Sequence, residues 1–384
     1  MGLEQWCSLK PPNSRSLSAR TRNSYSPLLC TSAQPYCRIV LAEMNMNTNR
    51  QWLLAKRPNG LVTRENFDYA ENPIPEPGEG QVLVRNLFLS FDPTQRGWME
   101  DRPSYLPPVG IGEPMRAGSV GQVTESRHPD FAVGDIVQTT GGWQDFVVAA
   151  PNQGPMGLTK LPEGVTPQMM LSVLGITGLT AYFGLLDLGD PKPGKTVLVS
   201  GAAGATGSVA GQIARIKGCR VVGIAGGPEK CAWLKEEAGF DDVIDYKQGN
   251  VNDQIKTTCP DKVDIYFDNV GGDILEAALN HINLRARVVM CGGISGYNAT
   301  EPVPGPANLM NIVTMRARME GFIILDYMPR AGEAIADLLQ WIGSGELKYQ
   351  VDLQQGFDNI PDTLQRLFTG ANLGKQLLQI AEPS

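Results

Sequence analysis

Hydrophobic and polar positions follow two different patterns along the chain, and the change between them falls near residue 167. Between residues 51 and 162, short apolar stretches recur at close intervals and are separated by turns rich in Pro and Gly. This spacing is typical of short strands in a small barrel-like β domain. The pattern predicts strands over residues 81–90, 118–123, 135–138 and 143–148.

Residues 169–186 carry no charge and are long enough to suggest a membrane-spanning helix. Glycines and hydroxyl side chains lower the hydrophobicity of this segment, however, and no basic flank marks a cytoplasmic side. We therefore expect a buried pair of helices packed at a domain junction.

From residue 196 onward, apolar strands alternate with segments whose apolar residues recur at helical spacing. The run Thr196–Ser200 is continuously apolar at its centre, as expected for a strand buried on both faces of a parallel sheet. Such alternation predicts a doubly wound sheet with right-handed crossovers. The expected strands are 196–200, 220–225, 242–246, 263–268, 287–291 and 375–380, and the expected helices are 208–217, 228–238, 274–284 and 331–341.

The first strand-to-helix junction has a glycine-rich turn, Ser200 to Gly207, with the sequence SGAAGATG. On the dinucleotide-binding fingerprint, the three key positions are Ala202, Gly204 and Gly207, so the first departs from the usual glycine. Gly204 would let the backbone approach a pyrophosphate, and the start of the helix would supply free N–H groups to it. A buried strand before the turn and an amphipathic helix after it provide the context that this motif requires.

The end of the second strand favours NADP over NAD. NAD-binding proteins place an acidic residue there to accept from the ribose hydroxyl, whereas this chain reads AGGPEK over residues 225–230. Lys230 would suit a 2′-phosphate, and helix geometry would turn Glu229 away from it. The alternative for Lys230 is a solvated lysine on the helix face.

Composition narrows the possible functions. The chain has 384 residues, too many for one core, and a formal net charge of −7, which argues against nucleic acid or an anionic membrane as partner. Only two histidines are present, and none of the seven cysteines forms a C-x-x-C pair. A zinc site and a disulfide framework are therefore not expected. A reducing compartment, the cytoplasm, fits best.

The first 43 residues differ from the rest, with five basic residues against two acidic ones, seven serines and no periodic apolar pattern. Such a leader resembles an organelle transit peptide. The alternative is a start codon assigned upstream of the true one, with translation from Met44 or Met46. Either way, we expect residues 1–45 to be disordered.

Five motifs beyond the glycine turn occur in the order known from one family. They are SFDPTQRG (90–97), FDNVGG (267–272), CGGISGYN (291–298), RMEGF (318–322) and NLGK (372–375). With them, the chain from about residue 49 to residue 380 resembles the zinc-independent medium-chain dehydrogenase/reductase superfamily. Within it, the chain is most similar to the group of leukotriene B4 dehydrogenase/prostaglandin reductase, plant 2-alkenal reductases and bacterial curcumin reductase.

The resemblance implies an α/β protein in which a Rossmann doubly wound parallel sheet accompanies a GroES-like β-barrel catalytic domain. The implied division is 46–170 for the first part of the catalytic domain and 171–315 for the NADP-binding domain. Residues 316–384 would complete the Rossmann sheet and return to the catalytic domain. The resemblance also implies a homodimer, formed through the edge of the Rossmann sheet.

The resemblance further implies reduction by NADPH of the carbon–carbon double bond of α,β-unsaturated ketones and aldehydes, without a metal. The phosphate-binding turn would be Gly204, Ala205, Thr206 and Gly207, with Lys230 and Tyr246 at the 2′-phosphate and ribose. Around the nicotinamide half, the matching residues are Asn269, Cys291, Gly292, Gly293, Ile294, Ser295, Gly296, Tyr297, Phe322, Ile323, Ile324 and Asn372.

Tyr297 matches the tyrosine that contacts the substrate carbonyl in this group. Hydride delivery to the β carbon leaves negative charge on that oxygen, and a positioned hydroxyl donor would stabilise the enolate. Arg96 is a candidate for binding a substrate carboxylate, with a structural salt bridge as the alternative. Thr94 stands where the group usually has an aromatic residue, so we expect an aromatic wall near the substrate to be missing.

Two other functions stay open on the sequence. One is NADPH-dependent quinone reduction, carried out by a related zinc-free branch. The other is a crystallin-like protein that binds the cofactor without turnover, because fold alone does not settle function.

Overall fold

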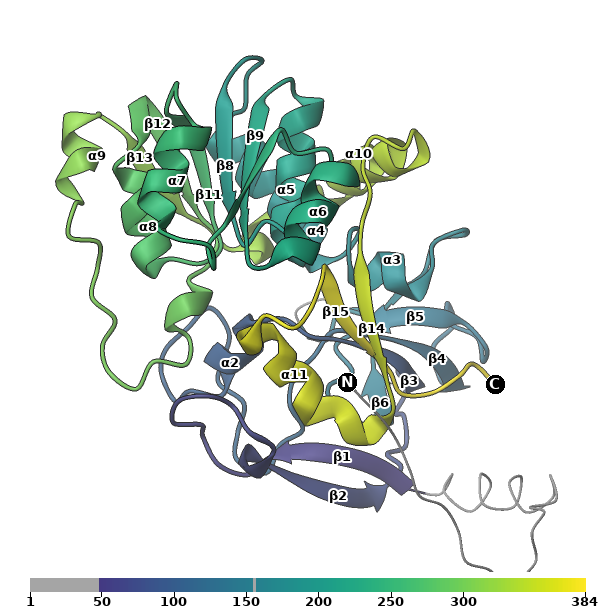
Figure 1. Cartoon of the computed structure of the whole chain (residues 1–384). Coiled ribbons are helices and arrows are strands. Elements are labelled where there is room, and N and C mark those ends of the chain that lie inside the picture. The colour runs from purple at the N-terminus through teal and green to yellow at the C-terminus, as the bar shows by residue number, and fades with distance from the viewer. Residues whose placement is uncertain (1–47, 155–156) are drawn as a thin grey trace, which may run out of the picture. The chain divides into compact units, whose positions relative to one another are not determined.

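A computed structural model describes residues 48–154 and 157–384 (Figure 1). These residues belong to one compact unit, Asn47–Ser384, whereas the leader and its predicted disorder lie outside the described residues. No helix in the described part is long and apolar enough to cross a membrane. Residues 169–186 instead form α3 (Pro167–Leu171), α4 (Ile176–Phe183) and the first half of a π-helical segment η2 (Gly184–Gly189).

A parallel sheet of six strands forms one half of the unit, in the order β10-β9-β8-β11-β12-β13. This order is that of a Rossmann sheet, with the reversal of strand order beside β8. The strands are β8 (Thr196–Ser200), β9 (Arg220–Ala225), β10 (Asp242–Asp245), β11 (Val263–Asp268), β12 (Ile282–Met290) and β13 (Arg318–Gly321).

Helices cover both faces of this sheet because successive strand residues point to opposite sides. Val197 and Val199 pack in a core with α4, α5 (Ala205–Ile216) and α10 (Ala331–Gly343), whereas Leu198 packs in a second core with α7 (Val251–Thr258) and α8 (Gly272–Leu279). The helices are α5 (Ala205–Ile216), α6 (Pro228–Glu236), α7 (Val251–Thr258), α8 (Gly272–Leu279), α9 (Met310–Thr314) and α10 (Ala331–Gly343).

The second half is built on a sheet in the order β14-β15-β3-β4-β5-β7, with β6 also paired to β3. Its members are β3 (Val82–Ser90), β4 (Ser119–Ser126), β5 (Ile136–Thr139), β6 (Phe146–Ala149), β7 (Thr159–Lys160), β14 (Val351–Gln355) and β15 (Lys375–Gln379). The end of the chain thus returns to the N-terminal strands, and β15 pairs antiparallel with β3 (Figure 1). The predicted fold class is confirmed, whereas the domain boundaries at residues 170 and 315 stay predictions.

Several elements depart from the predicted pattern. The sequence pattern did not predict the hairpin of β1 (Thr48–Leu54) and β2 (Phe67–Pro73) or the short helix α2 (Thr94–Trp98). It also did not predict the strands β13 and β14 or the helices α7, α9 and α11 (Ile360–Thr369). Short helical turns also occur at η1 (Arg64–Asn66), η3 (Ile294–Gly296), η4 (Ile324–Arg330) and η5 (Phe357–Asn359).

The helix predicted over 274–284 is too long. Helix α8 ends at Leu279, and β12 begins at Ile282 rather than at residue 287. The strand is hard to recognise in the sequence because its pairing with β11 shifts register between Val263 and Ile265, and because Arg285 has a left-handed φ of 64°. The local apolar spacing therefore predicted a helix that runs into the first residues of β12, a strand that is defined only by its parallel pairing.

Candidate functional site

The glycine turn between β8 and α5 has the backbone that close packing of strand and helix requires. Gly204 is the N-cap residue of α5, so the first N–H groups of that helix have no partner within it. A Cβ on Gly207 would lie 2.4 Å from the Gly201 carbonyl oxygen. Gly207 therefore must be glycine, and the free N–H groups and positive dipole end at the start of α5 are suited to binding an anion.

The departure at Ala202 is accommodated by the residues around it. Gly201 has a φ of +58° and makes the sharp turn after β8, whereas Ala202 is not among the residues with positive φ. A Cβ on Gly223 in β9 would lie 3.0 Å from the Ala202 Cβ, so the small residue in the neighbouring strand leaves room for the alanine methyl.

We expect Gly207→Ala to destabilise the fold, because the new methyl would meet backbone that cannot move freely. The expected cost is about 1–3 kcal/mol of unfolding free energy, the usual range for overpacking, measured by chemical denaturation. Gly332→Ala in α10 is the matched control, since no atom lies within 4 Å of its added Cβ. Equal effects of the two substitutions on the free energy of unfolding would contradict the conclusion that Gly207 must be glycine.

Lys230 and Tyr246 flank the end of the second Rossmann strand. Lys230 extends from α6 and its Nζ donates to the Gly370 carbonyl at 2.8 Å, so it is half-buried rather than a solvated surface lysine. Burial, and then the charge of Lys247, lower the pKa of Lys230. The Tyr246 ring packs on Gly226, where a Cβ would lie 2.6 Å from it, whereas Glu229 is exposed. Among the described residues, no carboxylate lies within salt-bridge distance of Lys230, so its charge is available to a phosphate.

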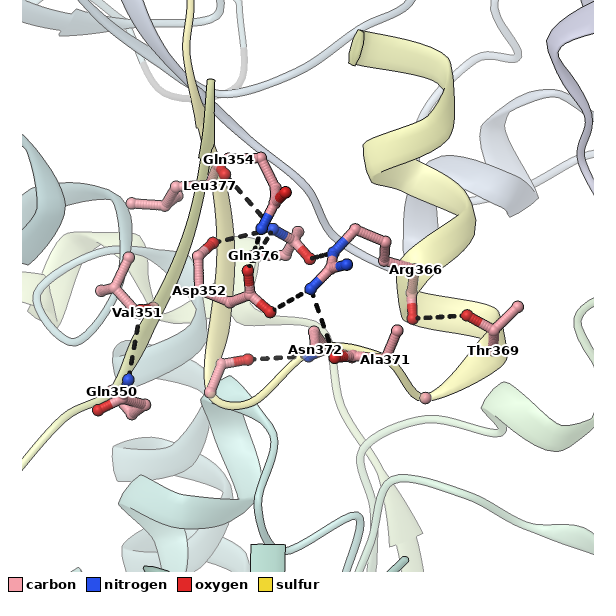
Figure 2. Close-up of polar contacts among 12 residues, drawn as sticks. Gln350, Val351, Asp352, Gln354, Arg366, Thr369, Ala371, Asn372, Gln376 and Leu377 are labelled. Carbon is pink, nitrogen blue, oxygen red and sulfur yellow. Dashed lines mark hydrogen bonds and ion pairs between the residues drawn. The ribbon is translucent and has the colours of Figure 1, made fainter. Parts of the chain in front are cut away.

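The segment that follows α11 connects the two halves of the unit at the glycine turn. The Gly374 N–H donates to the Ala203 carbonyl at 2.9 Å, and Gly374 forms a parallel bridge with Gly204. Figure 2 shows a polar network next to this segment, in which Arg366 donates to Asp352 at 2.7 Å and to Gln376 at 2.9 Å. The Arg366 guanidinium also reaches the Ala371 carbonyl at 3.4 Å.

Asn269 is held at the end of β11 by a buried hydrogen-bond network. Its side-chain amide donates to the Ser200 carbonyl at 2.7 Å, and its backbone N–H donates to the Ser200 hydroxyl at 2.9 Å. The fully buried Asp268 accepts from that hydroxyl at 2.7 Å and from the N–H groups of Val270 and Gly271. Asp268 therefore fixes the loop after β11, a role that the sequence motif did not reveal.

Tyr297 follows the turn η3 and faces back over the loop that begins at Cys291. The Gly293 N–H donates to the Tyr297 hydroxyl oxygen at 3.3 Å, which leaves the O–H proton free to be donated elsewhere. Burial raises the pKa of Tyr297, an effect that the Gly293 N–H partly offsets. Burial also raises the pKa of the Cys291 thiol to about 12, so this cysteine is not an activated nucleophile.

One cavity of about 800 Å³ brings most of the predicted site residues together. The predicted residues that line it are Gly204, Ala205, Thr206, Gly207, Lys230, Tyr246, Asn269, Cys291, Gly292, Ile294, Ser295, Tyr297, Phe322, Ile323, Ile324 and Asn372. Gly293 and Gly296 belong to the same loop but do not line the cavity. This gathering supports their assignment as site residues, while the role of each one stays a prediction.

Arg96 must be removed from the candidate substrate-binding residues. It is 2% exposed and does not line the cavity. Its guanidinium pairs with Glu100 at 2.8 Å and donates to the carbonyls of Pro58 and Gly60. These contacts match the structural salt bridge that the sequence left as the alternative, because the charge is already neutralised inside the fold.

The expected loss of an aromatic wall at Thr94 is compensated from a neighbouring loop. Thr94 and Tyr105 both line the cavity, and their hydroxyl groups are hydrogen-bonded to each other. Trp98, at the end of α2, lines the same cavity. Sequence reasoning missed Tyr105 because nothing local connects it with position 94.

A buried ion pair in the cavity wall was also missed. Lys375 is 2% exposed, donates to the Phe91 carbonyl at 2.9 Å and pairs with Asp92, which accepts from the Ser90 hydroxyl at 2.7 Å. Burial lowers the pKa of Lys375, and the Asp92 charge opposes that change. The NLGK and SFDP motifs contained both residues, but only the β15–β3 pairing brings them into contact.

A glycine-rich turn at the strand-order reversal, a basic side chain at the end of the second strand and a phenol that lines the same cavity are features of a dinucleotide-dependent oxidoreductase. Comparison with known proteins agrees. A family model described as the N-terminal domain of oxidoreductase matches residues 50–156, and one described as zinc-binding dehydrogenase matches residues 205–343.

In the described ranges, no group of three or more His, Cys, Asp or Glu side chains could hold a metal ion.

The chain is 44% identical to the NADPH-dependent curcumin reductase of Escherichia coli K12 over 339 residues, which cover 87% of this chain and 97% of the relative. It is 38% identical to prostaglandin reductase 1 of Rattus norvegicus, over 86% of this chain and 98% of the relative. The crystal structure of CurA from Vibrio vulnificus in complex with NADPH aligns with a TM-score of 0.82 and 43% identity, over 87% of this chain and 100% of that one. The chain therefore belongs to the medium-chain dehydrogenase/reductase superfamily, in its group of curcumin, prostaglandin and 2-alkenal reductases.

Proposed function

We propose that this protein uses NADPH to reduce the carbon–carbon double bond of α,β-unsaturated ketones and aldehydes. The observation that carries the proposal is the Tyr297 phenol, which lines the cavity, accepts from the Gly293 N–H and has its own proton free. The relatives named for curcumin, prostaglandin and 2-alkenal reduction support it.

The residues at the glycine turn and around it fit the cofactor. The first turn of α5 and Lys230 would hold the phosphates, and Asn269 with the loop from Cys291 would hold the nicotinamide half. When bound, NADPH supplies the hydride. Tyr297 would donate a hydrogen bond to the substrate carbonyl oxygen, where negative charge develops, and so stabilise the enolate.

The direct test is to mix the purified protein with NADPH and a simple enone, and to follow loss of the reduced nicotinamide absorbance. We expect NADPH oxidation that depends on the enone and yields the saturated ketone, identified by NMR. An allylic alcohol as the product would contradict the proposal. A faster turnover of quinones than of enones would favour quinone reduction, and cofactor binding without any turnover would favour the crystallin-like alternative.

We also propose a cytoplasmic homodimer that forms through the edge of the Rossmann sheet. Strand β13 lies at the end of that sheet, and the nearby helix α9 exposes Met310 and Val313 at 68% and 64%. An unpaired edge strand beside exposed apolar side chains favours pairing with a second copy.

Val313→Glu should therefore weaken the dimer, because it places a charge in the apolar contact. Sedimentation velocity at micromolar concentration should show a shift from dimer toward the 41.6 kDa monomer. Val133→Glu is the control, since Val133 is 67% exposed and lies between β4 and β5 in the other half. A wild-type protein that is monomeric at all concentrations would refute the dimer.

A further inference from the structure

The connection between α11 and β15, residues 370–374, contacts the candidate nucleotide site at both of its ends. At one end the Gly370 carbonyl accepts from Lys230, and at the other the Gly374 N–H donates to the Ala203 carbonyl in the glycine turn. Gly370 and Gly374 both have a left-handed φ, of 67° and 73°. Neither α11 nor β15 extends into the connection, so its position depends on contacts outside regular secondary structure.

Arg366 holds this connection from the last turn of α11 (Figure 2). Its backbone carbonyl accepts from the N–H groups of Gly370 and Ala371, and its guanidinium reaches the Ala371 carbonyl at 3.4 Å. The same guanidinium donates to Asp352 in β14 and to Gln376 in β15. Gln376 is fully buried and donates in turn to the Asp352 carbonyl at 2.8 Å. Arg366 therefore joins the helix, both strands and the connection, although it does not line the cavity.

The Asp352 carboxylate acts on Lys230 as well as on Arg366. Burial and the charge of Lys247 lower the pKa of Lys230, and Asp352 is the stronger of the two carboxylates that oppose this change. An unpaired carboxylate at Asp352 would attract Lys230 and repel a phosphate that approaches it. The salt bridge with Arg366 neutralises this charge, since the Asp352 side chain is only 13% exposed and pairs at 2.7 Å. The pairing thus leaves the charge of Lys230 for a nucleotide.

We propose that Arg366 is a positioning residue that sets the preference for NADPH over NADH. It neutralises Asp352, and it holds the Gly370 carbonyl that orients Lys230 toward the 2′-phosphate. Arginine suits this role because its planar group carries donors for Asp352 and Gln376 at the same time. The inference rests on the proposed use of NADPH and adds a residue outside the cavity that determines cofactor specificity.

The test measures the affinities for NADPH and NADH by fluorescence titration, without any enone. Arg366→Gln leaves Asp352 unpaired, so the ratio of the NADPH affinity to the NADH affinity should fall by about five- to tenfold, the effect of one uncompensated charge near a protein surface. Adding Asp352→Asn to that variant removes the carboxylate and should restore most of the ratio.

Arg50→Gln is the matched control. Arg50 also pairs with a carboxylate at 2.7 Å, that of Asp145, and its side chain is 29% exposed against 32% for Arg366. Neither Arg50 nor Asp145 lines the cavity, so this substitution removes an equivalent salt bridge and should leave the ratio unchanged.

Asp352→Asn alone should shift the ratio in the opposite direction, which keeps the inference testable if Arg366→Gln does not fold. It leaves the Arg366 charge unpaired, so the affinity for NADPH should rise relative to that for NADH, and added salt should reduce this gain. An unchanged ratio in these variants, or equal losses for both nucleotides, would show that Arg366 only supports the fold and would overturn the inference. Because no enone is present, the result does not depend on whether the protein reduces enones.

Discussion

Replacing Tyr297 by phenylalanine should lower kcat for enone reduction by about 10²- to 10³-fold, the usual loss for one donor at a developing oxyanion. The ring would keep its packing, and only the hydroxyl group of this cavity-lining residue would be lost. We expect NADPH affinity to be unchanged, because the Gly293 N–H is the group that loses a partner. Stopped-flow kinetics of hydride transfer with several enones would measure the effect, and an unchanged rate would remove Tyr297 from the mechanism.

The pH dependence of the wild-type rate provides a second test of the Tyr297 hydroxyl as a hydrogen-bond donor. Because burial raises the pKa of Tyr297, the phenol stays protonated through neutral pH and loses its proton only above its ordinary pKa. Donation from Tyr297 is therefore present at low and neutral pH and is lost as pH rises through the raised pKa. We expect this alkaline limb in the wild-type profile and its absence in Tyr297→Phe.

Replacing Lys230 by alanine should weaken NADPH binding by about 10- to 100-fold, which corresponds to the loss of a hydrogen bond to a charged group. NADH has no 2′-phosphate, so its binding should change little. Fluorescence titration with both nucleotides measures the change in each affinity, and hence the ratio of the affinity for NADPH to that for NADH. Lys235→Ala, on the same helix but paired with Asp242 at an exposed position, should leave both affinities unchanged.

Equal losses for the two nucleotides would mean that Lys230 supports the fold through its Gly370 contact and does not recognise the phosphate. The salt dependence of binding provides an independent check. Added ions screen the attraction between Lys230 and a phosphate, so the affinity for NADPH should fall more with salt than the affinity for NADH.

The Rossmann half was predictable because its signals are local. The apolar run at Thr196–Ser200, the glycine turn and the strand–helix alternation each occupy one short stretch of sequence. The Cβ clash at Gly207 gives the physical reason for one of these signals. Family motifs then added the residues that are predicted to lie around the nicotinamide half, most of which line the cavity.

Contacts between distant segments were not predictable in this way. Arg96 was a candidate for substrate binding until the structure placed Pro58 and Gly60 around it. Tyr105 replaces the aromatic missing at Thr94, and Lys375 meets Asp92, only because loops and strands far apart in sequence pack together.

The bond from Gly374 to Ala203 has a consequence for biosynthesis. The strand that Gly374 precedes, Lys375–Gln379, leaves the ribosome long after the glycine turn and the rest of the Rossmann half. The turn cannot gain this support until then. A nascent chain should thus acquire its full affinity for the nucleotide only once this strand has emerged, and a protein cut short before residue 374 should fold its Rossmann half yet hold the nucleotide poorly.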